Sequence, residues 1–261
     1  MPQVIFEKKG RIALVTINRP EKMNALNAEV VNGLNSAWHD IENDTDIWCS
    51  IVTGAGGRAF SAGADLKEMS DRRRGDGAGE GLLPRVRATG FWRTSDLTKP
   101  VIAAVDGYCL AGGLELALAC DFIIASDRSH FGLSEVLRAI IPGGGGTQRL
   151  PRAIPFRRAL EVLLTGDRLD ARQAYDLGLV NRVVKPEEVM PTAEELANKI
   201  NGNGPLAVRA IKQLAYQGMD MPLEQGLRLE ELVSQRIHKT EDSKEGPLAF
   251  VEKRKPNYKG R

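Results

Sequence analysis

Cysteine and histidine are scarce in this sequence of 261 residues, and each scarcity excludes a class of protein. Cysteine occurs three times, at Cys49, Cys109 and Cys120. An odd number without a Cys-x-x-Cys pair argues against a disulfide framework and favours buried thiols in a reducing compartment. Histidine also occurs three times, at His39, His130 and His238. None of the short spacings of metal ligands is present, so no metal site is expected.

The sequence also lacks an excess of one charge and a long apolar run. Lys and Arg number 36 against 34 Asp and Glu, and a net charge of +2 offers little attraction for nucleic acid or an anionic membrane. No stretch approaches the ~18 apolar residues of a membrane-spanning helix. Residues 1–10 lack the basic and apolar regions of a signal peptide. We therefore expect a soluble, cytoplasmic protein that binds neither a membrane nor nucleic acid.

What is present is the composition of a globular α/β protein, with 42% hydrophobic and 27% charged residues. Short apolar runs rich in β-branched residues predict buried strands at 12–17, 50–53, 101–105 and 122–125. Apolar residues at helical spacing predict helices at 28–41, with Asn27 as the N-cap, and at 113–120. A short helical turn is expected at 131–137. The order of strand, loop and helix is weakly repeated along the chain.

Beyond about residue 165 the pattern becomes mainly helical. Helices are expected at 170–177, 186–200, 205–216, 222–237 and 243–252, and the only strand-like run there is 179–184. We predict a core over residues 1–200 that carries the functional site. Residues 201–261 form a helical region that packs onto the core or onto a neighbouring subunit.

Glu115 lies in a predicted helix whose other residues are apolar on every face, so the helix should be buried. Burial of a carboxylate costs roughly several kcal/mol unless it is paired or its pKa is raised. The simpler explanation is a favourable position in the first helical turn, but the helix dipole contributes only ~0.3–1 kcal/mol there. Because the cost exceeds this gain, a functional role for Glu115 is favoured.

Glu135 is a weaker candidate, because an acid directly after a possible serine N-cap is ordinary at the start of a helix. Two glycine-rich turns strengthen the case for both acids. The turns are Ala62-Gly63-Ala64 and Ala111-Gly112-Gly113, each between an apolar strand and a helix start. The unpaired N–H groups of two such helix starts could bind an oxyanion, although glycine-rich turns also occur simply as turns.

Several longer motifs resemble the enoyl-CoA hydratase (crotonase) family over essentially the whole chain. The motifs are Ala59-Phe60-Ser61-Ala62-Gly63-Ala64-Asp65-Leu66-Lys67, Pro100-Val101-Ile102-Ala103-Ala104-Val105-Asp106-Gly107-Tyr108, Gly112-Gly113-Leu114-Glu115-Leu116-Ala117, Ile141-Pro142-Gly143-Gly144-Gly145-Gly146-Thr147-Gln148-Arg149-Leu150 and Ala249-Phe250-Val251-Glu252-Lys253-Arg254. The resemblance implies an α/β fold, a crotonase-like superhelix of strand-strand-helix units with a helical C-terminal region. It also implies a homotrimer or hexamer.

The resemblance further implies hydration of 2-enoyl-CoA thioesters to 3-hydroxyacyl-CoA. The implied catalytic groups are the carboxylates of Glu115, for the water, and Glu135, for the C2 proton, with the backbone amides of Ala64 and Gly112 as the oxyanion hole. The implied contacts to the CoA part of the substrate come from Ala25, Ala62, Asp65, Leu66, Lys67, Phe250 and Lys253, the last two from the helices of this or a neighbouring subunit. No cofactor is implied beyond the CoA that the substrate carries. One carboxyl must stay protonated, so a pKa near ~6–7 is expected.

Two departures from the family pattern leave alternatives open. Ser134 precedes the second glutamate where many hydratases have proline, and the segment 70–90 is long and rich in arginine. A dehydratase or isomerase acting on a functionalised acyl-CoA, such as carnitinyl-CoA, is therefore an alternative. An RNA-binding member of the family is another, for which the basic patch would be Arg72, Arg73, Arg74, Arg85, Arg87 and Arg93. A net charge near zero favours a solvated loop instead.

Overall fold

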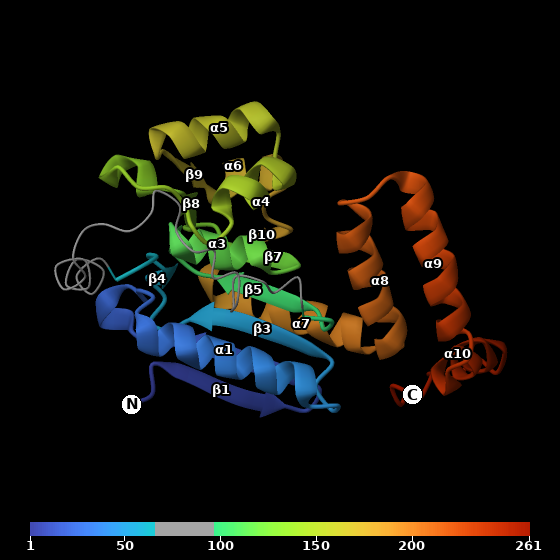
Figure 1. The fold of residues 1–261 in the computed structure, drawn as a ribbon. Coiled ribbons are helices and arrows are strands. Elements are labelled where there is room, and N and C mark those ends of the chain that lie inside the picture. The colour runs from blue at the N-terminus through green and yellow to red at the C-terminus, as the bar shows by residue number, and fades with distance from the viewer. Residues whose placement is uncertain (66–96) are drawn as a thin grey trace.

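The computed structural model describes residues 1–65 and 97–261, in which two sheets are flanked by helices (Figure 1). The strands are β1 Val4–Lys9, β2 Ile12–Ile17, β3 Cys49–Gly54, β4 Ala59–Ser61, β5 Val101–Val105, β6 Tyr108–Leu110, β7 Phe122–Ser126, β8 His130–Gly132, β9 Arg168–Asp170 and β10 Arg182–Val184. The helices are α1 Ala28–Asn43, α3 Gly112–Ala119, α4 Gly146–Ala153, α5 Phe156–Thr165, α6 Ala171–Asp176, α7 Val189–Asn201, α8 Pro205–Gly218, α9 Leu223–Ile237 and α10 Glu241–Val251. Short 3₁₀ helices are η1 Pro20–Lys22, η3 Glu135–Arg138 and η4 Pro186–Glu188.

The larger sheet has six strands in the order β1-β2-β3-β5-β7-β10. Strand β1 is antiparallel to β2, and the other neighbours are parallel, with Leu14 opposite Ile51 and Ile51 opposite Ile102. Every residue of β5 is buried, and β2 and β3 are almost as enclosed. Parallel strands covered on both faces have this continuous apolar sequence, which is why the sequence revealed them.

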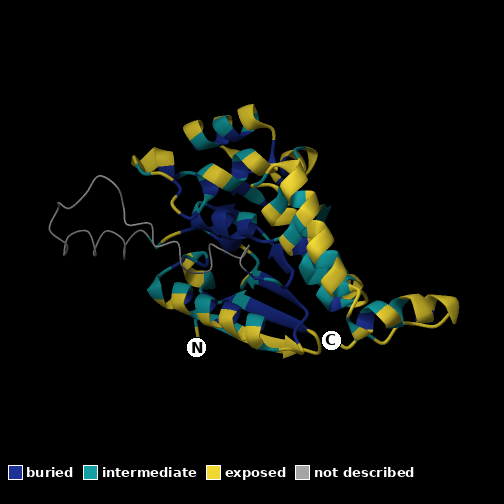
Figure 2. Cartoon of the chain, turned by 45° about the vertical axis from the view of Figure 1, so that its right-hand side comes forward, coloured by how far each residue is buried: buried dark blue, intermediate teal, exposed yellow. Residues whose placement is uncertain are grey.

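Helices cover both faces of the larger sheet, and the strands lie at the centre of the molecule (Figure 2). Because side chains alternate along a strand, Leu14, Ile51 and Ile102 pack on one face against α7. Val15, Ala103 and their equivalents pack on the other face with α1 and α3. Each fully buried aliphatic side chain contributes roughly 1.5–3 kcal/mol, so these two layers stabilise the position of α3.

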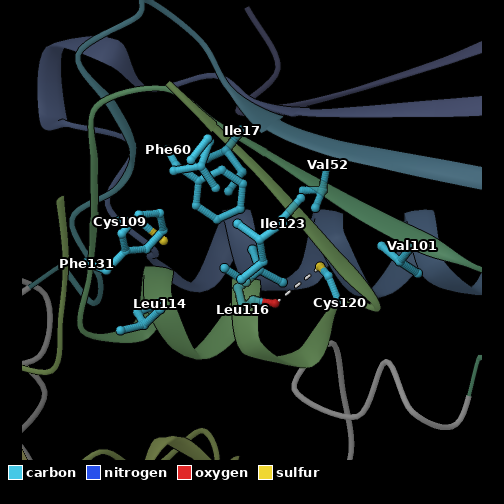
Figure 3. Close-up of a cluster of buried hydrophobic side chains, with 14 of the residues drawn as sticks. Ile17, Val52, Phe60, Val101, Cys109, Leu114, Leu116, Cys120, Ile123 and Phe131 are labelled. Carbon is cyan, nitrogen blue, oxygen red and sulfur yellow. Dashed lines mark hydrogen bonds between the residues drawn. The ribbon is translucent and has the colours of Figure 1, made fainter. Parts of the chain in front are cut away.

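The smaller sheet has four strands in the order β4-β6-β8-β9. Strands β4, β6 and β8 directly precede the segments that carry Ala64, Gly112 and Glu135. Phe60, Cys109 and Phe131 point from β4, β6 and β8 into the core, where they lie near Leu114 and Leu116 of α3 (Figure 3). At the end of α3, the Cys120 thiol donates a hydrogen bond of 3.3 Å to the Leu116 carbonyl (Figure 3). The three cysteines are all buried and unpaired.

Helices α8 and α9 pack together beside the core, and α10 follows at the C-terminal end (Figure 1). A buried lysine fixes α8 to the core. The Lys212 ammonium lies 2.8 Å from the Asp121 carboxylate and donates a hydrogen bond of 2.9 Å to the Lys99 carbonyl. No helix within the described residues is long and apolar enough to cross a membrane.

The structure confirms the predicted mixed α/β class and the strands at 12–17 and 101–105. It also confirms Asn27 as the N-cap of α1, with its side chain accepting from the Val30 amide. The expected helical turn at 131–137 is wrong over its first part, because Phe131 and Gly132 pair with Cys109 and Leu110 in the smaller sheet. Residues 168–170 form a further strand in the region expected to be helical.

Candidate active site

Glu115 lies in the first turn of α3, whose residues are buried except Leu118. The side chain is only 3% exposed. Its Oε1 accepts hydrogen bonds from two backbone amides, those of Gly144 at 2.6 Å and Gly146 at 2.8 Å. The carboxylate is therefore held by a turn that lies beyond it in the sequence and leads into α4.

Glycine is required where this turn meets the carboxylate. A Cβ at Gly146 would lie 2.9 Å from Leu133 Cδ1, 2.9 Å from Pro142 Cβ and 3.2 Å from Glu115 Oε1. Gly146 is also the first residue of α4, where backbone amides have no partner inside the helix and favour a negative charge. The turn thus forms a close-fitting binding site for the Glu115 carboxylate.

Burial and hydrogen bonding act in opposite directions on the pKa of Glu115. Burial raises the pKa, and this is the largest effect. The amides of Gly146 and Gly144 and the positive charge of Arg149 lower it. The charged form consequently has specific partners although the side chain has lost water.

Glu135 begins the 3₁₀ helix η3 and is 8% exposed. Its Oε2 is buried and has no hydrogen-bond partner within the described residues. Burial raises the pKa of Glu135 to about 7, with a further upward contribution from the charge of Glu115. Ser134 occupies the expected N-cap position, of the 3₁₀ helix η3, but its side chain makes no capping hydrogen bond.

The two carboxyls therefore have different environments. The Glu115 carboxylate accepts hydrogen bonds from two amides, and the charge of Arg149 favours its ionised form. Glu135 is buried, and one of its oxygens has no hydrogen-bond partner within the described residues. Two acids in environments as different as these can provide a base and an acid at the same pH. The expectation that one pKa would rise to ~6–7 is met at Glu135.

The two glycine-rich turns lie against each other. A Cβ at Gly63, where φ is +91°, would lie 2.6 Å from Ala111 Cβ and 2.9 Å from the Gly112 nitrogen. A Cβ at Gly113 would lie 2.3 Å from the Ser61 carbonyl oxygen. These contacts require glycine and place the backbone of 62–64 beside the start of α3. Within the described residues, neither the Ala64 amide nor the Gly112 amide donates a hydrogen bond.

The turn at 62–65 is fixed by the segment at 23–26. The Leu26 amide donates to the Gly63 carbonyl at 2.8 Å, and the Ala62 amide donates to the Met23 carbonyl at 2.9 Å. Arg19 joins the two segments, because its guanidinium donates to the Ala25 carbonyl at 2.6 Å and lies 3.1 Å from the Asp65 carboxylate. Ala25, Ala62 and Asp65 are thus brought together with Ala64.

Two other residues predicted to contact CoA, Phe250 and Lys253, do not lie beside Ala64 within the same chain. Phe250 is 85% exposed on α10, and α10 lies on the opposite side of the molecule from β4 (Figure 1). Lys253 lies two residues beyond the end of α10. Leu66, Lys67 and the arginines between 72 and 93 lie outside the described residues.

Sequence reasoning did not assign roles to Gly144, Gly146, Arg19 or Arg149. The run of glycines at 143–146 was a signal for close backbone approach, but it did not indicate which side chain the amides bind. Glu115 and Gly144 are 29 residues apart, so only the fold brings them together. No group of His, Cys, Asp or Glu suited to a metal ion occurs in the parts 1–65 and 97–261.

The chain is similar over nearly its whole length to known proteins and solved structures. Residues 7–261 match the family described as enoyl-CoA hydratase/isomerase. The chain is 44% identical to the short-chain-enoyl-CoA hydratase of Clostridium acetobutylicum, over 97% of this chain and 95% of that protein. It is 42% identical to the (E)-benzylidenesuccinyl-CoA hydratase of Thauera aromatica, over 98% and 99% of the two chains. The crystal structure of an enoyl-CoA hydratase from Mycobacterium tuberculosis H37Rv matches with a TM-score of 0.91 and 42% identity, covering 100% of both chains.

Proposed function

The chain belongs to the enoyl-CoA hydratase/isomerase family and is an enoyl-CoA hydratase, and we propose that Glu115 and Glu135 together add water to its 2-enoyl-CoA substrate. The observation that supports this most directly is the difference between the two buried carboxyls. Glu115 has two amide donors for its charged form, whereas Glu135 has a pKa raised to about 7.

In the proposed reaction, the Glu115 carboxylate accepts a proton from water as the water oxygen bonds to C3 of the enoyl group. The electron pair of the C2–C3 double bond moves toward the thioester, whose oxygen becomes negative between the amides of Ala64 and Gly112. The Glu135 carboxyl then gives its proton to C2. The product is the 3-hydroxyacyl thioester, and one proton returns from Glu115 to Glu135 by way of solvent.

Isomerisation of a double bond needs one acid–base group that moves a proton between two carbons. Two buried carboxyls in different environments therefore favour hydration. The reverse dehydration uses the same groups, so a dehydratase acting on a functionalised acyl-CoA stays an alternative. A spectrophotometric comparison of crotonyl-CoA, longer 2-enoyl-CoA, 3-enoyl-CoA and crotonobetainyl-CoA separates these activities and identifies the acyl group. The relatives named above act on very different acyl groups at similar identity, so identity does not choose among them.

The CoA part of the substrate is proposed to contact Ala25, Ala62, Asp65, Leu66 and Lys67. Phe250 and Lys253 would reach the nucleotide end from a neighbouring subunit, because α10 lies away from β4 in its own chain. We propose a homotrimer or hexamer for this reason. No cofactor is proposed other than the CoA of the substrate. Three buried, unpaired thiols support a place in the reducing cytoplasm.

The proposal is tested by substituting each glutamate with its neutral isostere. Glu115→Gln and Glu135→Gln should each lower kcat for hydration by at least ~10²-fold, the scale of a positioned acid or base. Both variants should fold, because glutamine keeps the side-chain volume. The measurement is the decrease in absorbance of the 2-enoyl thioester, with the melting temperature taken on the same preparation.

Glu161→Gln is the matched control, because this glutamate lies on α5 and its carboxylate pairs with Arg158 at an exposed position of the same helix. It should retain the wild-type rate. Turnover like that of the wild type in Glu115→Gln or Glu135→Gln would remove that glutamate from the mechanism.

A further inference from the structure

We infer that Arg149 is a positioning residue for Glu115, because its guanidinium fixes the turn whose amides bind the Glu115 carboxylate. This inference rests on the proposed role of Glu115 as the base that activates water. Arg149 lies in α4, one turn beyond Gly146, and it does not itself accept or donate the reacting proton.

Arg149 holds the turn through both its side chain and its backbone. The Nη1 group donates to the Gly144 carbonyl at 2.9 Å, and the Arg149 amide donates to the Gly145 carbonyl at 2.8 Å. Gly144 is therefore bound at both of its polar groups: its amide donates to Glu115, and its carbonyl accepts from Arg149. Loss of the guanidinium would therefore free the Gly144 peptide to move, and with it the amide that donates to the Glu115 carboxylate.

The sequence of the turn leaves room for the guanidinium. A Cβ at Gly145 would lie 2.1 Å from Arg149 Nη1, and the φ of Gly145 is +105°. A side chain at this position would both strain the backbone and displace the guanidinium. Gly145 thus leaves space for the guanidinium, whereas the amides of its neighbours Gly144 and Gly146 donate to Glu115.

Arg149 also sets the charge around Glu115. Helix α4 contributes Arg149, and η3 contributes Glu135, whereas β4 and β6 contain no charged residue. The cation lowers the pKa of Glu115 against the effect of burial. Arginine suits this position because its planar guanidinium fixes the direction of its hydrogen bonds, whereas the ammonium of a lysine would supply the charge without that geometry.

The experiment compares kcat, KM and the pH profile of kcat/KM for the wild type, Arg149→Gln and Arg149→Lys. In Arg149→Gln, kcat should fall about 10- to 100-fold, the effect of one lost charge-assisted hydrogen bond, with a smaller change in KM. The acid limb of the profile should move to higher pH, because the cation that lowers the pKa of Glu115 is gone. In Arg149→Lys the acid limb should return toward that of the wild type, while kcat recovers only in part.

Arg152→Gln is the matched control, because Arg152 lies on the same helix and its guanidinium donates to the Gln148 carbonyl at an exposed site. It should change neither kcat nor the acid limb. Arg149→Met is a second neutral variant that keeps the apolar stem, in case Arg149→Gln folds poorly.

Three outcomes would overturn the inference. The first is an Arg149→Gln variant with wild-type kcat and an unmoved acid limb. The second is a loss of kcat that follows a loss of thermal stability while the acid limb stays in place. The third is failure of both neutral variants to fold, which assigns Arg149 to stability alone. An active Glu115→Gln variant would instead overturn the proposed function, so the two failures are distinguishable.

Discussion

At the scale of single residues, the burial of Glu135, the proposed acid, opposes stability. Its pKa in the folded protein is about 7, above the ordinary value of 4.5, so the folded state binds this proton more tightly than the unfolded state. The contribution to stability is complete below about pH 4.5 and is lost as the pH rises through about 7. Ionisation of Glu135 should therefore make the wild type less stable at pH 8 than it would be if this side chain stayed neutral.

The corresponding prediction concerns Glu135→Gln. This variant should have a higher melting temperature than the wild type at pH 8, because it has no charge to bury. The difference in the free energy of unfolding should be on the order of 2–3 kcal/mol and should disappear near pH 4.5. Thermal unfolding of both proteins between pH 4 and 8 provides the measurement. A difference that does not depend on pH would show that ionisation of Glu135 is not its cause.

At the scale of helices and strands, α8 depends on a buried ion pair. Lys212 is bound to Asp121 at 2.8 Å, and the two side chains are 7% and 11% exposed. Asp121 also accepts from the Val101 amide at 2.7 Å, so it joins the start of β5 to the residue that precedes β7. Removal of the lysine would leave this carboxylate buried without its cation.

We expect Lys212→Met to lower the free energy of unfolding by about 3–5 kcal/mol, as for other broken buried pairs. The measurement is urea unfolding monitored by circular dichroism. Lys9→Met is the control, because Lys9 lies 3.6 Å from Glu194 at an exposed site and such pairs contribute about 0–1 kcal/mol. A cost for Lys212→Met no larger than that of the control would mean that α8 is held by its apolar contacts.

The elements also show which parts of the fold the sequence could predict. The strands at 12–17 and 101–105 were predictable because burial on both faces leaves an unbroken apolar run. The strands β4, β6 and β8 have three residues each, which is too short for periodicity, and their pairing is decided by contacts distant in sequence. The prediction of a helical turn at Phe131 fails for this reason.

The candidate site was predictable to a similar extent. The buried environment of Glu115 followed from the apolar residues around it in α3. Its partners did not, because a backbone amide has no residue type that identifies it and Gly144 becomes a donor only through the fold. The roles of Glu115, Glu135, Ala64 and Gly112 stay predictions, as does the division of the chain at residue 200.

At the scale of the whole molecule, large apolar side chains remain exposed on the C-terminal helices. Leu223 and Leu227 lie one turn apart on α9, and Phe250 and Val251 end α10. Large exposed apolar patches are typical of surfaces that bind another molecule, including another protein chain. It is therefore consistent with the proposed assembly of identical subunits.

We predict that multi-angle light scattering at micromolar concentration gives the mass of a trimer or a hexamer. The double variant Leu223→Glu/Leu227→Glu should move the mass toward that of the monomer, because charges replace the apolar contact. Lys9→Met is again a suitable control, since it leaves these helices unchanged. A wild-type protein that is monomeric under these conditions would contradict the proposed assembly.

The strand order of the larger sheet has a consequence for how the chain is made. Along β1-β2-β3-β5-β7-β10, position in the sheet increases with position in the sequence. During synthesis on the ribosome, each new strand can therefore add to the free edge of strands already formed, and none has to insert between two paired neighbours. Until β10 and α7 emerge, however, the growing edge and one apolar face stay uncovered. The nascent chain is thus most vulnerable to aggregation until β10 and α7 have left the ribosome and covered this edge and this face.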